Sequence, residues 1–102
     1  MGELVKVTAV SEVPNNEGRV FEVKGQQVAL FNVDGKICAI ENVCPHRGGP
    51  LGEGSLDGAI VTCPWHGWQF DVTTGQSPVN PAASVKTFPC KVEGANVSVE
   101  VE

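Results

Sequence analysis

The chain has 102 residues, of which 41% are hydrophobic and 19% charged, and its formal net charge is −5 at pH 7. This length and composition are typical of one folded, soluble domain, so we treat residues 1–102 as a single domain. The negative charge argues against nucleic acid or an anionic membrane as partner and favours a partner with a basic docking face. No apolar run approaches the roughly 18 residues that a membrane span needs.

Short strand-like runs follow one another along the chain, separated by turn signals. We expect strands within 3–10, 18–33 (interrupted at Lys24–Gly25), 36–43, 57–63, 67–72, 84–94 and 96–102. Asp34–Gly35 joins two of these runs and is a strong hairpin signal, because both residues tolerate positive φ. No segment has the apolar periodicity of a helix over three turns. The sequence therefore predicts an all-β domain.

Two regions interrupt this pattern. Residues 44–58 contain five glycines in fifteen positions, and residues 73–84 are rich in proline and small side chains. Dense glycine allows the backbone to pass close to a neighbouring group that a Cβ would obstruct.

The chain has only two histidines and four cysteines, and both histidines lie just after a cysteine. The two pairs are Cys44 with His46 and Cys63 with His66, and a proline follows each cysteine. A role as small buried hydrophobes suits Cys38 and Cys90, which lie in strand-like runs, but it leaves the spacing of the two pairs unexplained. The pairs predict a metal centre held by two stiff loops, since proline restricts its own φ and the residue before it. Zinc and a 2Fe–2S cluster both accept two cysteines and two histidines.

The signature Cys44-x-His46, sixteen intervening residues, Cys63-x-x-His66 resembles the cluster-binding motif of Rieske iron–sulfur proteins. The glycine-rich segment, "GWQFD" after His66 and the strands beyond extend the resemblance over the whole chain. It implies one 2Fe–2S cluster, with Cys44 and Cys63 on the inner iron and His46 and His66 on the outer iron. It also implies an antiparallel β-sandwich with a small cluster-binding subdomain inserted at about 43–71, and a third loop around 77–83.

Departures from the family pattern indicate the subtype. Rieske subunits of cytochrome b complexes carry an extra cysteine in each loop, where this chain has Gly49 and Trp65. They also place serine and tyrosine hydroxyls where this chain has Trp68 and Phe70. Fewer hydrogen bonds to sulfur stabilise the reduced state less, so we expect a midpoint in the lowest quarter of the family range of about −150 to +300 mV.

The resemblance implies an electron carrier rather than an enzyme. Fused Rieske oxygenases add a mononuclear iron held by two histidines and a carboxylate, and this chain has no histidine left for one. We expect a free-standing Rieske ferredoxin that takes electrons from a flavoprotein reductase and passes them to a terminal, aromatic-ring hydroxylating oxygenase. A small Rieske subunit of an assimilatory nitrite reductase is the alternative, and a zinc-stabilised binding module is the third.

The sequence also allows predictions about the protein's location and about the residues around the centre. The N-terminus shows no signal-peptide pattern, so we expect a cytoplasmic monomer whose cysteines form no disulfide framework. Near the ligands in sequence, five residues are candidates for an exposed rim: Arg47, Pro50, Leu51, Trp65 and Pro81. Trp65 would either contact a partner or pack over the cluster, whereas Trp68 and Phe70 alternate along a strand and are expected in the core.

Overall fold

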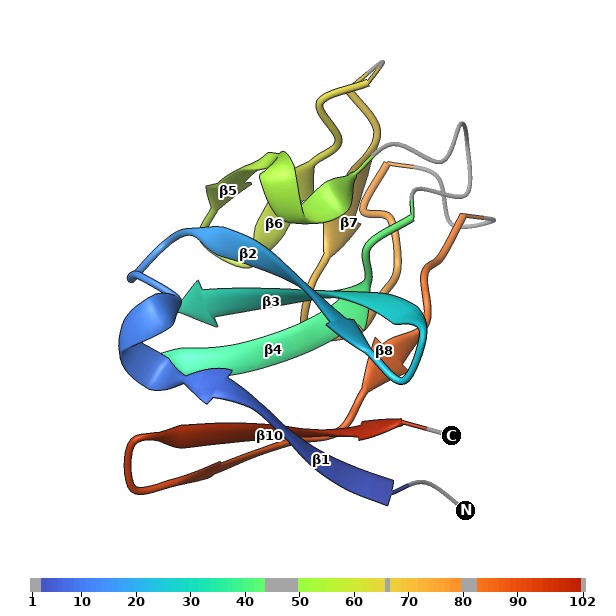
Figure 1. Cartoon of the computed structure of the whole chain (residues 1–102). Coiled ribbons are helices and arrows are strands. Elements are labelled where there is room, and N and C mark those ends of the chain that lie inside the picture. The colour runs from blue at the N-terminus through green and yellow to red at the C-terminus, as the bar shows by residue number, and fades with distance from the viewer. Residues whose placement is uncertain (1–2, 44–49, 66, 80–82, 102) are drawn as a thin grey trace.

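The computed structural model describes residues 3–43, 50–65, 67–79 and 83–101. These residues form ten strands and two short 3-10 turns, arranged in three antiparallel sheets (Figure 1). The strands are β1 (Glu3–Ala9), β2 (Gly18–Val23), β3 (Gln26–Val33), β4 (Lys36–Glu41), β5 (Ser55–Asp57), β6 (Ile60–Thr62), β7 (Gln69–Asp71), β8 (Thr87–Phe88), β9 (Cys90–Glu93) and β10 (Asn96–Val101). The 3-10 turns are η1 (Val10–Glu12) and η2 (Leu51–Glu53). The predicted all-β, antiparallel fold is confirmed.

The central sheet has the order β2-β3-β4-β8 and is built on two tight hairpins. Lys24 and Gly25 connect β2 to β3, and Asp34 and Gly35 connect β3 to β4. All four residues have positive φ, between 51° and 94°, as two-residue hairpins of the favoured twist require.

Both faces of this sheet are covered, which explains the unbroken apolar runs in its middle strands. Ala29 and Phe31 of β3 pack with Cys38 and Ile40 of β4 into one core cluster. The alternating residues Val28, Leu30, Ile37 and Ala39 pack into a second cluster on the opposite face.

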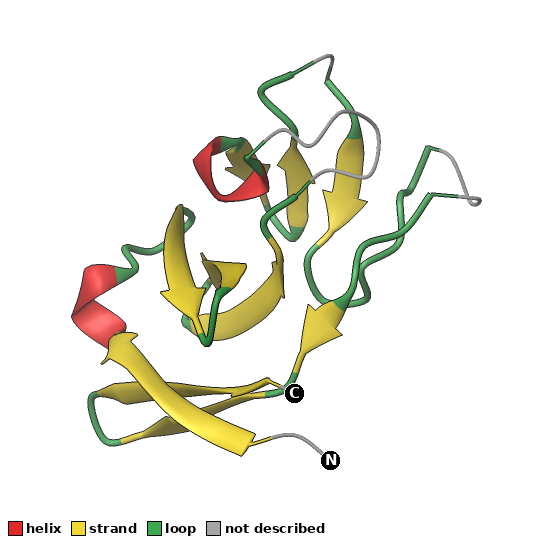
Figure 2. Ribbon diagram, turned by 45° about the vertical axis from the view of Figure 1, so that its right-hand side comes forward, coloured by secondary structure: helices red, strands yellow, loops and turns green. Residues whose placement is uncertain are grey.

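The second cluster is closed by the terminal sheet, of order β1-β10-β9, which pairs the two ends of the chain. Val97, Val99 and Val101 of β10 all lie in this cluster, as their alternation with polar residues predicts. In Figure 2 this sheet crosses below the central one, so the two form a β-sandwich.

One predicted strand, within 84–94, is wrong as a single element. It divides at Pro89 into β8, which pairs with β4, and β9, which pairs with β10. Proline has no backbone N–H to donate to a ladder, so the chain changes sheets at this position.

The third sheet, β5-β6-β7, lies on the other side of the central sheet and consists of three-residue strands (Figure 1). Leu51 from η2, Val61 from β6 and Phe70 from β7 join the first core cluster. In sequence this sheet lies between β4 and β8. Neither 3-10 turn of the described segments has the length of a transmembrane helix.

Candidate metal centre

Cys63 is the one predicted ligand within the described residues. It directly follows β6, is only 2% exposed and belongs to the first core cluster. Cys44, His46 and His66 lie outside the described residues, so their roles as ligands stay predictions. The described residues, which include only one of the four predicted ligands, contain no group of three His, Cys, Asp or Glu side chains able to bind a metal.

A tight hairpin between β6 and β7 holds Cys63. Its backbone N–H donates to the carbonyl oxygen of Trp68 at 2.6 Å, continuing the ladder one step beyond the Thr62–Gln69 pair. Gly67 has a φ of 74°, a conformation that favours glycine, and lets the chain turn back after position 66. The hairpin therefore holds the backbone of Cys63 next to Trp68.

The sulfur of Cys63 accepts a backbone hydrogen bond. The Trp65 N–H donates to its Sγ at 3.4 Å. Such bonds favour an electron-rich sulfur, which suits a thiolate ligand and raises the potential of a cluster bound to it. A buried cysteine with an N–H directed at its sulfur fits an iron–sulfur centre.

The stems of the two ligand-bearing segments lie side by side. Val43 and Pro50 form a β-bridge that flanks residues 44–49. From there the chain continues through η2 to β5, where Ser55 pairs with Thr62, the residue before Cys63. A Cβ at Gly54 would lie 2.1 Å from the Thr62 carbonyl oxygen, so only glycine fits this approach. The fold thus joins the end of the first segment to the start of the second.

A third loop starts after β7. Its base is closed by a bridge between Gln76 and Ser84 and by a 3.1 Å bond from the Ser77 N–H to the Ala83 carbonyl oxygen. Val79 in this loop is 73% exposed. A cavity of about 260 Å³ is lined by Ser77 and Val79 together with residues 67–69.

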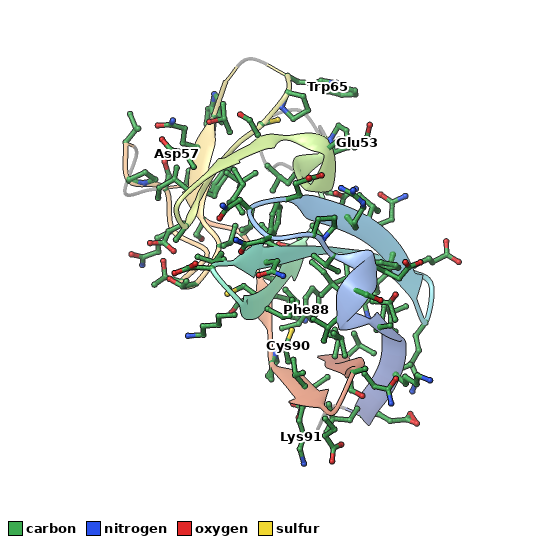
Figure 3. The ribbon with its side chains drawn as sticks, turned by 90° about the vertical axis from the view of Figure 1, so that its left-hand side faces the viewer. Glu53, Asp57, Trp65, Phe88, Cys90 and Lys91 are labelled. Atoms are coloured by element: carbon green, nitrogen blue, oxygen red, sulfur yellow. The ribbon has the colours of Figure 1, made fainter. Side chains whose placement is uncertain are left out.

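The predicted rim is partly wrong. Leu51 is fully buried in the core instead of lying at the surface, because η2 turns its side chain inward to the first core cluster. Trp65 is 50% exposed and lies at the tip of the molecule (Figure 3), which favours a surface contact. Arg47 and Pro81 lie outside the described residues. Phe70 is buried in the core, as expected, whereas Trp68 is only half-buried and packs against the same core.

The two remaining cysteines lie away from this end. Cys38 is buried in β4, as predicted, whereas Cys90 is only half-buried because it begins an edge strand of the terminal sheet (Figure 3). Both are thiols outside any disulfide. Burial, with a smaller contribution from Cys38, raises the pKa of Cys90 to about 12. Thiols of such high pKa are poor nucleophiles, consistent with a packing role.

The chain is similar to known proteins of one family over nearly its whole length. The family model described as Rieske [2Fe-2S] domain matches residues 3–89. The biphenyl dioxygenase ferredoxin subunit of Pseudomonas sp. (strain KKS102) is 40% identical over 98 residues, covering 93% of this chain and 89% of that protein. The ferredoxin component of the alkene monooxygenase system of Xanthobacter autotrophicus is 40% identical over 103 residues, covering 98% and 83%.

Solved structures agree on the fold. The ferredoxin in a complex of reduced oxygenase and oxidized ferredoxin in carbazole 1,9a-dioxygenase superposes with a TM-score of 0.86 at 32% identity, over 94% of this chain and 91% of that one. A structure described as a nitrite reductase small subunit from Mycobacterium tuberculosis gives a TM-score of 0.91 over 100% and 97% of the chains, but its 24% identity shows the fold alone. The chain belongs to the Rieske [2Fe-2S] domain family, whose cofactor is a Rieske-type 2Fe–2S cluster.

Proposed function

We propose that the chain is a one-electron carrier that takes electrons from a flavoprotein reductase and passes them to a terminal oxygenase. The observation that carries this is the match to ferredoxin components of oxygenase systems over nearly the whole chain. In this proposal Cys44 and Cys63 hold the inner iron, and His46 and His66 hold the outer iron. The cluster supplies the redox chemistry, and the protein sets its potential, exposure and docking.

The same comparisons support a carrier over an enzyme. Both relatives are named as ferredoxin components, and with both histidines assigned to the cluster the chain has none for a mononuclear iron site. The nitrite reductase alternative has support only from fold likeness. We therefore propose electron transfer to an oxygenase, and not to a nitrite reductase, as the function.

We propose one domain over residues 1–102, with the cluster-binding subdomain at about 43–71 inserted in the sandwich. The short sheet β5-β6-β7 and the adjoining stems support this division. We also propose that the protein is a cytoplasmic monomer that meets its partners in small, short-lived encounters.

The docking face in this proposal is the tip that carries the ligand loops. Three of the large hydrophobic side chains exposed in the described residues lie in or next to the ligand-bearing segments or the third loop: Val43, Trp65 and Val79. Exposed aromatic side chains are enriched at the centres of protein interfaces. Trp65 is the strongest candidate for a contact with the oxygenase.

A stopped-flow experiment tests the proposal. The protein is reduced anaerobically with NADH and the reductase of a biphenyl dioxygenase system, and then mixed with the oxidised terminal oxygenase. We expect one electron per chain and reoxidation whose rate rises with oxygenase concentration. A cluster-loaded protein that neither accepts nor delivers electrons with these partners would refute the assignment.

A matched pair of variants locates the docking face. Trp65→Ala should lower the second-order rate with the oxygenase about tenfold, the effect of losing roughly 1.4 kcal/mol in the encounter complex. Leu4 is also 50% exposed but belongs to β1, which lies at the other end of the molecule from β5, β6 and β7 (Figure 1), so Leu4→Ala should leave this rate unchanged. Equal effects of the two substitutions would place docking elsewhere.

A further inference from the structure

A buried asparagine lies at the base of the first ligand-bearing segment. Asn42 follows β4 directly, precedes Val43, and is 3% exposed. A buried polar side chain is costly unless its hydrogen bonds are satisfied, so its partners indicate its role.

Asn42 accepts two hydrogen bonds from the backbone at the far end of this segment. Its carbonyl oxygen accepts the Leu51 N–H at 2.7 Å, and its side-chain Oδ1 accepts the Gly52 N–H at 2.7 Å. One residue therefore joins the two ends of the segment that carries Cys44 and His46.

The central sheet in turn holds Asn42. Its backbone N–H donates to the Gln27 carbonyl oxygen at 3.2 Å, and its Nδ2 donates to Gln27 Oε1 at 3.2 Å. Gln27 belongs to β3, so the base of the loop is attached to the most enclosed sheet of the molecule. The orientation of the asparagine is set by partners on both sides.

The far side of the segment has little room to move. A Cβ at Gly52 would lie 2.4 Å from Val20 Cγ2 and 3.0 Å from Asn42 Oδ1. The neighbouring Leu51 side chain is fully buried in the core. The two amides that donate to Asn42 therefore belong to a stretch of backbone that packing already confines.

We propose that Asn42 is a positioning residue that sets the distance between the two ends of the first ligand-bearing segment before the cluster binds. This inference rests on the proposed ligand roles of Cys44 and His46. A closed base reduces the conformational freedom of the segment and holds its ligands near the geometry that the irons require. Groups that orient metal ligands from behind commonly change metal retention when they are removed.

Asn32 provides a matched control. It is 7% exposed and also makes two side-chain bonds, from its Nδ2 to the Val13 carbonyl oxygen at 2.9 Å and from the Gly35 N–H to its Oδ1 at 2.8 Å. These bonds hold the β3–β4 turn and the residue that follows η1, which adjoin neither ligand-bearing segment. Asn32→Ala thus removes comparable buried hydrogen bonds elsewhere.

The test combines two measurements on the loaded protein. Iron release to a chelator is followed by visible absorbance, and hydrogen exchange is followed at the Leu51 and Gly52 amides. We expect Asn42→Ala to release iron about tenfold faster and to exchange both amides at least about tenfold faster. Asn32→Ala should change neither rate by more than about twofold.

A third variant keeps both the size of the Asn42 side chain and its hydrogen-bonding geometry. Asn42→Asp keeps an acceptor for the Gly52 N–H, and Gln27 can rotate its amide to donate to the second oxygen. This variant should retain iron nearly as well as the natural protein. Equal iron release from Asn42→Ala and Asn32→Ala, or faster amide exchange without faster iron release, would overturn the inference while leaving the carrier function intact. A natural protein without iron would instead refute the proposed function.

Discussion

The sandwich and the ligand end of the molecule are built differently. β2, β3 and β10 have six to eight residues each and pair along their length, over a core of alternating apolar side chains. β5, β6 and β7 have three residues each and give way to turns that carry the ligands. Apolar burial stabilises the sandwich, whereas the ligand end depends more on turn hydrogen bonds, close glycine contacts and the metal itself.

The difference predicts two levels of stability in one domain. Short strands with few ladder bonds open more easily than long ones buried on both faces. Binding of a cluster by the ligand end would therefore stabilise the region that is weakest without it.

The largest expected effect distinguishes cysteines of the two regions. Cys63→Ser should abolish the cluster, because a serine hydroxyl does not replace a thiolate ligand to iron. Cys90→Ser, in the sandwich, should retain the full iron content. Iron and sulfide analysis checks both, and loss of iron from the Cys90 variant would contradict the ligand assignment.

The second effect concerns cooperativity. Phe70→Ala at the ligand end should lower the free energy of unfolding by about 3–5 kcal/mol, and Leu30→Ala in the sandwich by about 2–5 kcal/mol. Denaturation is followed by cluster absorbance and by far-ultraviolet circular dichroism. The cluster transition should precede the backbone transition in the Phe70 variant and coincide with it in the Leu30 variant. Coincidence in both would show one cooperative unit.

The third effect is on the midpoint potential, which we expect to change only with substitutions at the ligand end. Phe70→Tyr adds a hydroxyl at the position where high-potential relatives carry tyrosine. The midpoint should rise by about 60 mV for each 1.4 kcal/mol by which the new hydrogen bond favours the reduced state. Phe88→Tyr in the sandwich core is the control and should not shift it. A natural midpoint above about +100 mV would contradict the predicted low potential.

The smallest effect tests the thiol of the sandwich. A pKa of about 12 leaves very little Cys90 thiolate at pH 8, and only the thiolate reacts with alkylating reagents. Cys90 should react roughly thirtyfold or more slowly in the folded protein than after unfolding. Mass spectrometry after timed iodoacetamide treatment measures this, and equal rates would show that the site is open to solvent.

Local patterns predicted most of the fold. The hairpin at Asp34–Gly35 and the inward face of Val97, Val99 and Val101 are confirmed, because turn chemistry and side-chain alternation act over a few residues. The burial of Leu51 and the division of a strand at Pro89 were missed. Both depend on which distant strand the chain meets, and one sequence does not show that.

In the candidate centre, too, local patterns were predicted and a feature that depends on distant contacts was missed. The spacing of cysteines and histidines predicted four ligands, since the chemistry requires those residue types close together. Asn42 carried no such signal, because an asparagine before a glycine-rich segment is common in loops. Only the hydrogen bonds to Leu51 and Gly52 reveal it.

The most direct test of the central claim is a low-temperature EPR spectrum of the dithionite-reduced protein, with iron, sulfide and zinc quantified on the same sample. The account predicts about two irons per chain and a rhombic signal with the low average g value of mixed histidine and cysteine ligation. A colourless, EPR-silent protein with one tightly bound zinc would contradict it.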